Sequence, residues 1–381
     1  MSATARRRVR QLAVAAATTV TLVGSVAGTA SGIDLSPRTI YETTVQSPAV
    51  QVGGTYTPIV GNFAGSTASD IVWYAPGPGA DHLWTSTGAR GVFTKSTLRI
   101  EGTYTPLVGD FGGDGFDDIF WYETGPARDV LWTSVPGPAV FFSSSVTVNG
   151  TYRPIALDST LDLALYLEPS AGTNPKDTIV WYRPGPGTDI VWSFNLDGTH
   201  DTGTIAIEGS PQLIAFNDGS DPRQDLLAYT PGPGPDAIYR SDTGAFSKVP
   251  KTVNGSYTPQ ALGGGYYDSI LWIGAGAAVD AFWANLGCCG ITSSATVPIG
   301  PTRVIPFGAA SGDGYVYNPT GPDQGFIGGY LVASLGPDIG PGALPFVGDF
   351  DGNHLPDAFF YRPGAGVDTV AYSAEPTWPS P

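Results

Sequence analysis

The sequence predicts an all-β fold in which seven four-stranded antiparallel units form a ring, a seven-bladed β-propeller. Three observations predict it: pairs of tryptophans recur with one separation, one opening motif recurs along the chain, and no segment has helical periodicity. Repeated units of about 50 residues, each with four short strands, are typical of propeller blades.

The recurrent aromatic pairs define the units. Four pairs are separated by eleven residues: Trp73 and Trp84, Trp121 and Trp132, Trp181 and Trp192, Trp272 and Trp283. Three more copies keep this separation with other residues: Ala228 and Tyr239, Val316 and Ile327, Phe360 and Ala371. We therefore expect seven units between about residues 41 and 373.

Each unit repeats the same elements in the same order. A Gly-Thr/Ser-Tyr-x-Pro motif opens units at residues 54–58, 102–106, 150–154 and 255–259. A short apolar strand follows, then a polar loop that ends in Asp, then an aromatic strand such as Asp-Ile-Val-Trp-Tyr at 70–74. A proline-glycine turn, such as Pro-Gly-Pro-Gly at 76–79, leads to a third strand, and a more polar fourth strand completes the unit.

Hairpin register and ring closure follow from this order. If the turn is centred between Gly77 and Pro78, or one residue later, Trp73 and Trp84 lie opposite or diagonal on one face. The last unit stops after its third strand, while residues 42–52 resemble a fourth strand. We expect this N-terminal strand to complete the last blade and close the ring. Unit six, around residues 304–337, is the shortest, and unit three carries an insertion at 160–175.

The N-terminus resembles a secretory signal peptide. Four arginines (Arg6, Arg7, Arg8 and Arg10) precede an alanine-rich stretch with small-residue cleavage positions up to Ala30. An uncleaved membrane anchor is the alternative, but the apolar run is short and diluted by threonine and glycine. The prediction is a signal peptide at 1–30, one propeller domain at 41–373, a tail at 374–381 and a secreted protein without a membrane span in its mature chain.

Charge and cysteine content exclude several functions. Four of the 18 basic residues lie in the signal, so 14 remain against 34 acidic residues, and the mature surface repels nucleic acid and anionic lipid. The two cysteines, Cys288 and Cys289, are adjacent. They form a vicinal disulfide, stay free or pair with another molecule; a rigid turn is favoured over a redox role because no basic residue is near.

Two polar loops have the spacing of a cation site. When the first acid is position one, Asp110, Asp114 and Asp118 occupy positions one, five and nine. Asp349, Asp351, Asn353 and Asp357 occupy positions one, three, five and nine of the second loop. With the main-chain carbonyl of position seven, Phe116 or Leu355, these oxygens suit calcium better than magnesium. We predict structural calcium in both loops.

These loops, each followed by an apolar strand, resemble the FG-GAP or VCBS repeats of integrin-α-like seven-bladed propellers, and the WYxPGPGxDxxW continuation resembles repeats of secreted bacterial proteins. The resemblance implies the propeller fold and calcium in the matching loops. A third, weaker match has Asn217, Asp221 and Asp225, with Gly219 at position three. Unit one keeps Asn62 and Asp70 but is assigned no metal, and neither are units three, five and six. The alternative for these loops is an Asx turn.

A second acid recurs eight residues after the first aromatic residue of each pair, with Gln324 as the exception: Asp81, Asp129, Asp189, Asp236, Asp280 and Asp368. Capping of the turn is favoured over a repeated ligand site. If the units do bind a sugar, the candidates are Asp81, Asp129 and Asp189 with Trp84, Trp132 and Trp192. Packing between blades is the alternative reading for the tryptophans.

No catalytic motif stands out, and the three histidines, His82, His200 and His354, lie in different units. The first functional hypothesis is therefore a secreted, non-catalytic protein, adhesion- or lectin-like, that binds an extracellular glycan or protein. The alternative is an extracellular carbohydrate-active enzyme, a polysaccharide lyase or glycoside hydrolase. Its only asymmetric candidate is the insertion of unit three, with Glu168, Lys176 and Asp177 near Arg183.

Overall fold

The computed structural model describes the propeller region with several gaps. The described residues are 41–126, 128–135, 137, 140–159, 176–195, 199–221, 223–242, 245–263, 267–274, 279–285, 291–296, 303–307, 314–319, 321–327, 330–332 and 339–373. The predicted signal peptide, the insertion at 160–175 with Glu168, the two cysteines and the tail at 374–381 lie outside the described residues.

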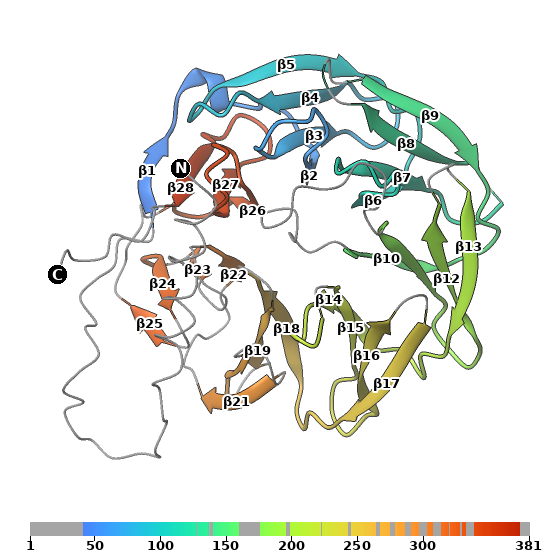
Figure 1. Cartoon of the computed structure of the whole chain (residues 1–381). Helices are drawn as coiled ribbons and strands as arrows, with labels where there is room; N and C mark the ends of the chain where they lie inside the picture. The colour runs from blue at the N-terminus through green and yellow to red at the C-terminus, as the bar shows by residue number, and fades with distance from the viewer. Residues whose placement is uncertain are drawn as a thin grey trace, which may run out of the picture.

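Seven four-stranded antiparallel sheets form a ring (Figure 1), which confirms the predicted seven-bladed propeller. We number the blades along the chain. Blade one is β2 (Thr57–Gly61), β3 (Asp70–Tyr74), β4 (Asp81–Ser86) and β5 (Phe93–Leu98). Blade two is β6 (Thr105–Gly109), β7 (Asp118–Tyr122), β8 (Asp129–Val135) and β9 (Val140–Val146). Blade three is β10 (Arg153–Leu157), β11 (Thr178–Tyr182), β12 (Asp189–Phe194) and β13 (His200–Ile205).

The remaining blades follow the same order. Blade four is β14 (Gln212–Phe216), β15 (Asp225–Tyr229), β16 (Asp236–Asp242) and β17 (Ala245–Lys251). Blade five is β18 (Tyr257–Leu262), β19 (Ser269–Gly274), β20 (Ala281–Asn285) and β21 (Ile291–Thr296). Blade six is β22 (Arg303–Pro306), β23 (Gly314–Tyr317), β24 (Gln324–Ile327) and β25 (Tyr330–Val332), which are the short strands expected there. Blade seven is β26 (Leu344–Gly348), β27 (Asp357–Tyr361), β28 (Thr369–Ser373) and the N-terminal β1 (Tyr41–Val45).

The N-terminal strand closes the ring as predicted. Strand β1 pairs antiparallel with β28, so Val45 lies opposite Val370 and both ends of the propeller meet in blade seven (Figure 1). A short 3₁₀ helix, η1 (Pro48–Val50), then leads the chain to blade one. The first strands of neighbouring blades contact one another around the whole circle, including β26 against β2.

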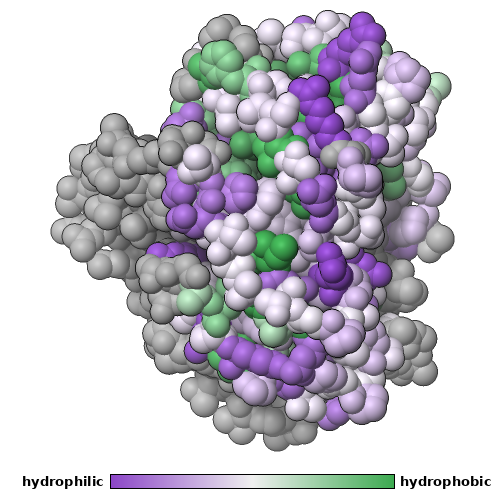
Figure 2. All heavy atoms as spheres, turned by 90° about the vertical axis from the view of Figure 1, so that its right-hand side faces the viewer, coloured by the Kyte–Doolittle hydropathy of each residue, from purple (hydrophilic) through white to green (hydrophobic). Residues whose placement is uncertain are grey.

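Burial explains the composition of the strands. The second strands β3, β7, β15 and β27 are buried at every position, because neighbouring blades cover both faces of each sheet. A strand buried on both faces reads as a continuous apolar run. The fourth strands lie at the rim, and β5 is mostly exposed and polar. Figure 2 shows this rim as polar residues mixed with small apolar patches.

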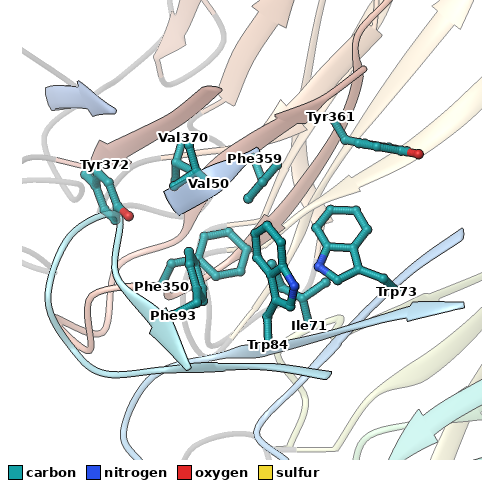
Figure 3. Packing of buried hydrophobic residues seen from close by; sticks show 10 residues of the cluster. All are labelled: Val50, Ile71, Trp73, Trp84, Phe93, Phe350, Phe359, Tyr361, Val370 and Tyr372. Carbon is teal, nitrogen blue, oxygen red and sulfur yellow. The ribbon is translucent and has the colours of Figure 1, made fainter. Parts of the chain in front are cut away.

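The tryptophan pairs are diagonal, one of the two predicted arrangements. Trp73 lies opposite His82 and Ile71 lies opposite Trp84, so the turn is centred between Gly77 and Pro78. The Trp73 and Trp84 rings are T-shaped with centroids 5.4 Å apart, and the other three pairs are T-shaped at 4.7–5.3 Å. Figure 3 shows this pair in the core between blades one and seven, where the Trp73 indole nitrogen faces Trp84.

The first tryptophan of each pair is buried with an indole nitrogen that has no hydrogen-bond partner among the described residues: Trp73, Trp121, Trp181 and Trp272. A T-shaped aromatic pair brings a ring edge to a ring face, and an N–H group can donate weakly to that face. The repeated pairs therefore stabilise the cores between blades through packing, because no conventional hydrogen bond accompanies them.

In blade six the predicted frame is wrong by one residue. Gly314 lies opposite Phe326, so Phe326 occupies the place that the spacing assigned to Ile327. The acid of this turn is Asp323 rather than the polar Gln324. Asp323 is buried and accepts hydrogen bonds from the amides of Asn318 and Ile339, at 2.6 and 2.8 Å. The turn of blade six is one residue shorter than the turns of the other blades, so the predicted eleven-residue separation points one residue too far along the chain.

In six of the seven blades a tyrosine at the end of the second strand joins the blade to the next one. Its hydroxyl donates to the carbonyl of the glycine that opens the following blade: Tyr74 to Gly102, Tyr122 to Gly150, Tyr182 to Gly209, Tyr229 to Gly255, Tyr317 to Gly340 and Tyr361 to Gly54, at 2.6–2.9 Å. Blade five has Ile273 at this position, which has no hydroxyl to donate. The tyrosines thus form a repeated connection between blades that the spacing analysis missed.

Candidate metal centre

The loop of blade seven is shaped by its first aspartate. This loop joins β26 to β27, and the Asp349 carboxylate accepts hydrogen bonds from the amides of Gly352, Asn353 and His354, at 2.7–3.1 Å. Gly352 and His354 have positive φ angles of 75° and 66°, which turn the loop back over this carboxylate. These amides hold the Asp349 carboxylate in place without a bound ion.

Three carboxylates of this loop converge. One oxygen each of Asp349, Asp351 and Asp357 can be chosen so that all three lie within 4.8 Å of one another. Within the part of the chain that the structure describes, this is the only such group of three acidic, histidine or cysteine side chains. The group consists of positions one, three and nine of the predicted calcium site. Hard oxygen donors at this separation suit a calcium-sized cation.

The other two predicted ligands lie in the same loop. The Asn353 side-chain oxygen accepts a hydrogen bond from the Leu355 amide at 2.8 Å, which fixes the segment that carries the Leu355 carbonyl. The Asp357 oxygens accept hydrogen bonds from the amides of Ser373 and Phe350, both at 2.8 Å. Asp357 therefore ties the loop to β28 as well as facing the other carboxylates.

The electrostatics of the cluster favour a positive partner. The pKa of Asp357 is raised to about 8, mainly by burial and also by the neighbouring carboxylates of Asp351 and Asp349, against the lowering effect of the Ser373 amide. Burial also raises the pKa of Asp349. One cation already reaches the group, because the Arg90 Nε lies 2.7 Å from the Asp351 Oδ2. Arg90 comes from blade one, 261 residues away in sequence, so no local pattern could have identified it.

The loop lies where the ring closes. The Asp349 amide donates to the Ser69 hydroxyl at 3.0 Å, and the Ser69 amide donates to the Asp349 carbonyl at 2.5 Å. The Ser86 hydroxyl donates to the Phe350 carbonyl at 2.6 Å. With the Arg90 ion pair, these contacts join the loop of blade seven to blade one. A cation held by this loop would therefore stabilise the junction between the last and the first blade.

The loop of blade two shares the first aspartate but has no carboxylate at position three. Asp110 accepts hydrogen bonds from the amides of Gly113, Asp114 and Gly115, and the Phe116 amide donates to the Asp114 carboxylate. Burial raises the pKa of Asp118 to about 8. Asp110, Asp114 and Asp118 do not form a group within 4.8 Å among the described residues. Position three is Gly112, and a Cβ added there would lie 3.2 Å from the Asp118 Oδ2 and 3.8 Å from the Asp114 Oδ1.

The loops of blades one and four close on themselves. Each begins with asparagine: the Asn62 amide group donates to the Ser66 carbonyl at 2.8 Å, and the Asn217 amide group donates to the Asp221 carbonyl at 3.0 Å. In blade four the Arg240 guanidinium also contacts Asp218, at 2.5 Å. The asparagine thus places a donor beside the carbonyl of position five, where an aspartate places only acceptors.

The weaker calcium prediction in blade four has its residues in that self-closed loop. Asp225 accepts hydrogen bonds from the amides of Ser241 and Asp218, and burial raises its pKa to about 8. Asp221 accepts a hydrogen bond from the Arg223 amide at 2.7 Å. The side chains of all three predicted ligands, Asn217, Asp221 and Asp225, therefore hydrogen-bond backbone groups. Calcium in this loop stays an untested prediction.

A second connection between blades lies beside these loops. Besides the Ser69–Asp349 contact, four residues that precede a second strand each exchange two hydrogen bonds with position one of the loop in the preceding blade, at 2.6–3.1 Å: Asp117 with Asn62, Asp177 with Asp110, Gln224 with Asp158, and Asp268 with Asn217. Burial raises the pKa of Asp117 to about 7 and that of Asp268 to about 6. Asp177, a residue of the enzyme hypothesis, therefore has a position in the contact between blades two and three.

The recurrent turn acids lie inside the blades. One oxygen of Asp81 accepts from the Ala75 amide and the other from the Ile100 amide; Asp129 does the same with Glu123 and Val148, and Asp189 with Arg183 and Ile207. All three carboxylates are buried. Trp84 and Trp192 are also buried, and Trp132 is half-buried against Phe141. This placement agrees with the capping and packing readings, and sugar binding by these residues stays untested.

The three histidines are distributed over blades one, three and seven. His82 and His200 lie on strands, where His200 stacks on Trp192 with centroids 3.8 Å apart, and His354 lies in the loop of blade seven. Arg183, the last residue of the enzyme hypothesis, packs over the Tyr152 ring at 5.1 Å. No helix in the described residues is long and apolar enough to cross a membrane.

Comparison with known proteins gives a likeness to a solved toxin structure and no family. No family model and no curated protein sequence matches the chain. The chain is similar to part of the solved Photorhabdus luminescens Tc holotoxin pore, with 10% sequence identity and a TM-score of 0.45 over 86% of this chain. It spans 14% of the length of that toxin chain. The FG-GAP/VCBS resemblance therefore stays a prediction from the loop pattern, whereas the propeller fold is established by the strand topology.

Proposed function

We propose that the chain is a secreted, non-catalytic binding protein whose propeller is braced by calcium at the closure of the ring. The observation that supports the calcium brace is the convergence of Asp349, Asp351 and Asp357 within 4.8 Å. These carboxylates, the Asn353 side chain and the Leu355 carbonyl are the residues that would hold the ion. Bound calcium would supply positive charge against three partly or fully buried acids.

The binding role is supported by the similarity of the blades. Propellers present many loops on two faces and serve as scaffolds for recognition, although the fold alone does not decide between a binding protein and an enzyme. In this chain the polar side chains that recur in most blades, the turn acids and the second-strand tyrosines, bond to the backbone and connect the structure. We propose an extracellular glycan or protein as the ligand, with recognition by the loops that differ between blades.

Calcium binding is tested by equilibrium dialysis of the full chain and of two matched variants. Asp357→Asn removes a carboxylate of the proposed site. Asp70→Asn is the control, because Asp70 occupies the same position in the self-closed loop of blade one and accepts hydrogen bonds from the equivalent amides of Phe63 and Ser86. We expect the D357N variant to lose the site and the D70N variant to keep it. Absence of binding in the unaltered chain, or equal loss in both variants, would contradict the calcium brace.

Ligand binding is tested separately. The purified chain is labelled and applied to arrays of extracellular glycans and of secreted or cell-surface proteins, with calcium and with EGTA. Retention on a defined group of glycans or on a defined protein would support the binding role. Release of modified products from the same glycans would instead support the carbohydrate-active enzyme.

A further inference from the structure

The four blades that keep the full opening motif place a tyrosine ring over its glycine. A Cβ added to Gly54, Gly102, Gly150 or Gly255 would lie 2.4–2.7 Å from the Cε2 atom of the tyrosine two residues later. These rings, Tyr56, Tyr104, Tyr152 and Tyr257, also pack edge-on against the first tryptophan of their own blade, with centroids 6.0–6.2 Å apart. The junction before each of these blades is therefore covered by an aromatic ring.

Blade four lacks both rings. Its opening glycine is Gly209, but Pro211 stands where the other blades have tyrosine, and Ala228 stands where they have tryptophan. A Cβ added to Gly209 would meet no atom within 4 Å. One backbone contact of the junction is kept, because the Tyr182 hydroxyl still donates to the Gly209 carbonyl at 2.8 Å. The absence of the ring leaves the junction between blades three and four uncovered.

A groove of about 310 Å³ lies at this junction. Its walls are the turn of blade three, residues 185–187, and the segment that opens blade four, residues 207–210. The volume lies at the lower limit of the pockets that bind small molecules or single side chains. Pro186 provides exposed apolar surface, Ile207 lies buried beneath the groove, and the glycines let a ligand approach the backbone closely.

The charges around the groove are already compensated. Glu208, the charged residue of the lining, has its carboxylate 3.4 Å from the Lys248 ammonium group. Burial raises the pKa of Tyr182, and the neighbouring Ser210 side chain lowers it. A strongly charged ligand would have to replace one of these contacts, whereas an uncharged ring would not. The other blades also show which group fits against this backbone, since a phenol ring covers the equivalent glycine four times.

We infer that the groove between blades three and four takes an aromatic side chain, a tyrosine, presented by a partner protein. The partner's ring would lie over Gly209 and against Pro186, where Tyr56, Tyr104, Tyr152 and Tyr257 supply an internal ring in their own blades. The inference rests on the proposed binding role but not on calcium. Strand β11 separates the groove from the carboxylate loops, because the loops precede the second strands and the groove's turn follows one.

The test uses N-acetyl-L-tyrosinamide as the probe and amide NMR shifts of the full chain as the readout, with calcium and with EGTA. We expect saturable shifts at Gly185, Gly187 and Gly209 with a Kd on the order of 1 mM, in both conditions. The equivalent amides of Gly77 and Gly102 should not shift, because Tyr104 already lies over Gly102 at that junction. N-acetyl-L-leucinamide and N-acetylglucosamine are the comparison probes, and equal shifts by either one would overturn the aromatic occupant.

Two variants locate the site. Pro211→Tyr supplies the ring that the other blades carry, so binding should weaken at least tenfold while the melting temperature is kept or raised. Tyr104→Ala removes the ring that lies over Gly102, so a second set of shifts should appear at Gly77 and Gly102. A folded P211Y variant that binds like the unaltered chain would overturn the inference. If that variant does not fold, the Y104A variant decides, because an unchanged single site there contradicts the role of the ring. Loss of calcium binding with intact tyrosinamide binding would separate a failed calcium brace from a failed groove.

Discussion

The loops of blades two and seven have the same acidic spacing but a different geometry. Both begin with an aspartate that accepts three backbone amides, and both end with a buried aspartate whose pKa is raised to about 8. Only the loop of blade seven brings three carboxylates within 4.8 Å in the described residues, and it carries Asp351 where blade two has Gly112. Position three is therefore where the two loops differ in gathered charge, and calcium in the loop of blade two stays an untested prediction.

The loops of blades one and four extend the comparison to position one. Asn62 and Asn217 donate to a carbonyl of their own loops, so these loops close without any positive ion. Asp110 and Asp349 have no such donor and accept amides only. A carboxylate at position one therefore leaves the loop without this internal donor.

The largest effect should come from breaking the loop of blade seven. Asp349→Ala is expected to lower the free energy of unfolding by about 4 kcal/mol in calcium, of which about 2.7 kcal/mol reflects lost binding at a hundredfold excess over the Kd. Denaturant unfolding with calcium and with EGTA measures both parts. Asp110→Ala is the matched control in blade two. Equal loss of calcium-dependent stability in both variants would contradict a difference in calcium binding between the two loops.

A pH effect should follow from Asp70 in the self-closed loop of blade one. Burial raises the pKa of Asp70 to about 6, although the amides of Ser86, Ala64 and Phe63 lower it. The folded state then binds this proton more tightly than the unfolded state, whose carboxyl titrates near pH 4. The stabilisation is complete below about pH 4 and declines by about 3 kcal/mol as the pH rises to about 6.

Asp70→Asn should remove this part of the pH dependence. Unfolding free energies between pH 4 and pH 7 measure it, with calcium and with EGTA, because this loop is not expected to bind calcium. An unchanged slope in the variant would mean that other buried acids carry the dependence. A slope that calcium abolishes would mean that the loop of blade one also holds a cation.

Adding an acid at position three of blade two tests whether this position accounts for the difference from blade seven. Gly112→Asp places a carboxylate at position three of blade two, and we expect a second calcium ion per chain and about 2 kcal/mol of calcium-dependent stability. The fit is tight, since the new Cβ would lie 3.2 Å from the Asp118 Oδ2, so the variant should be less stable in EGTA. Equilibrium dialysis counts the ions. Gly112→Asn adds a side chain of similar size without the charge. A second ion in that variant would mean that the charge at position three is not what binds it.

The smallest effect concerns the arginine at the cluster. Arg90 places a positive charge 2.7 Å from Asp351 and competes with a cation for it. Arg90→Gln should increase calcium affinity about fivefold, corresponding to about 1 kcal/mol for two unit charges a few ångströms apart in water. Arg99→Gln is the control, because its ion pair with Glu101 is exposed and lies in the same blade. Unchanged affinity in the R90Q variant would show that the guanidinium moves away when calcium binds.

Regular spacing made the fold predictable. The eleven-residue tryptophan separation fixed the hairpin register, and the missing fourth strand of the last unit predicted the pairing of β1 with β28. The prediction for blade six was wrong by one residue, because the shorter turn places the turn acid at Asp323 instead of position 324. A count of fixed distances cannot detect such a slip when the local residue, Gln324, is also polar.

Contacts between blades were less predictable. The tyrosine that follows the tryptophan in blades one, two and three recurs plainly, but its partner glycine belongs to the next unit. Arg90 and Asp351 are farther apart still, and only the closed ring brings them together. The acidic loops showed which residue types could bind calcium, whereas the distances that separate blade seven from blade two depend on the folded backbone.

The pairing of β1 with β28 also determines how the ring responds to force. Tyr41 lies opposite Ser373, so the outward ends of the two terminal strands lie at the same end of the ladder. Tension applied through the two chain ends would peel these strands apart one hydrogen bond after another instead of loading all the bonds together. The closure should therefore be the mechanically weakest contact of the ring, and a cation beside it at Asp349 would resist the next step of opening.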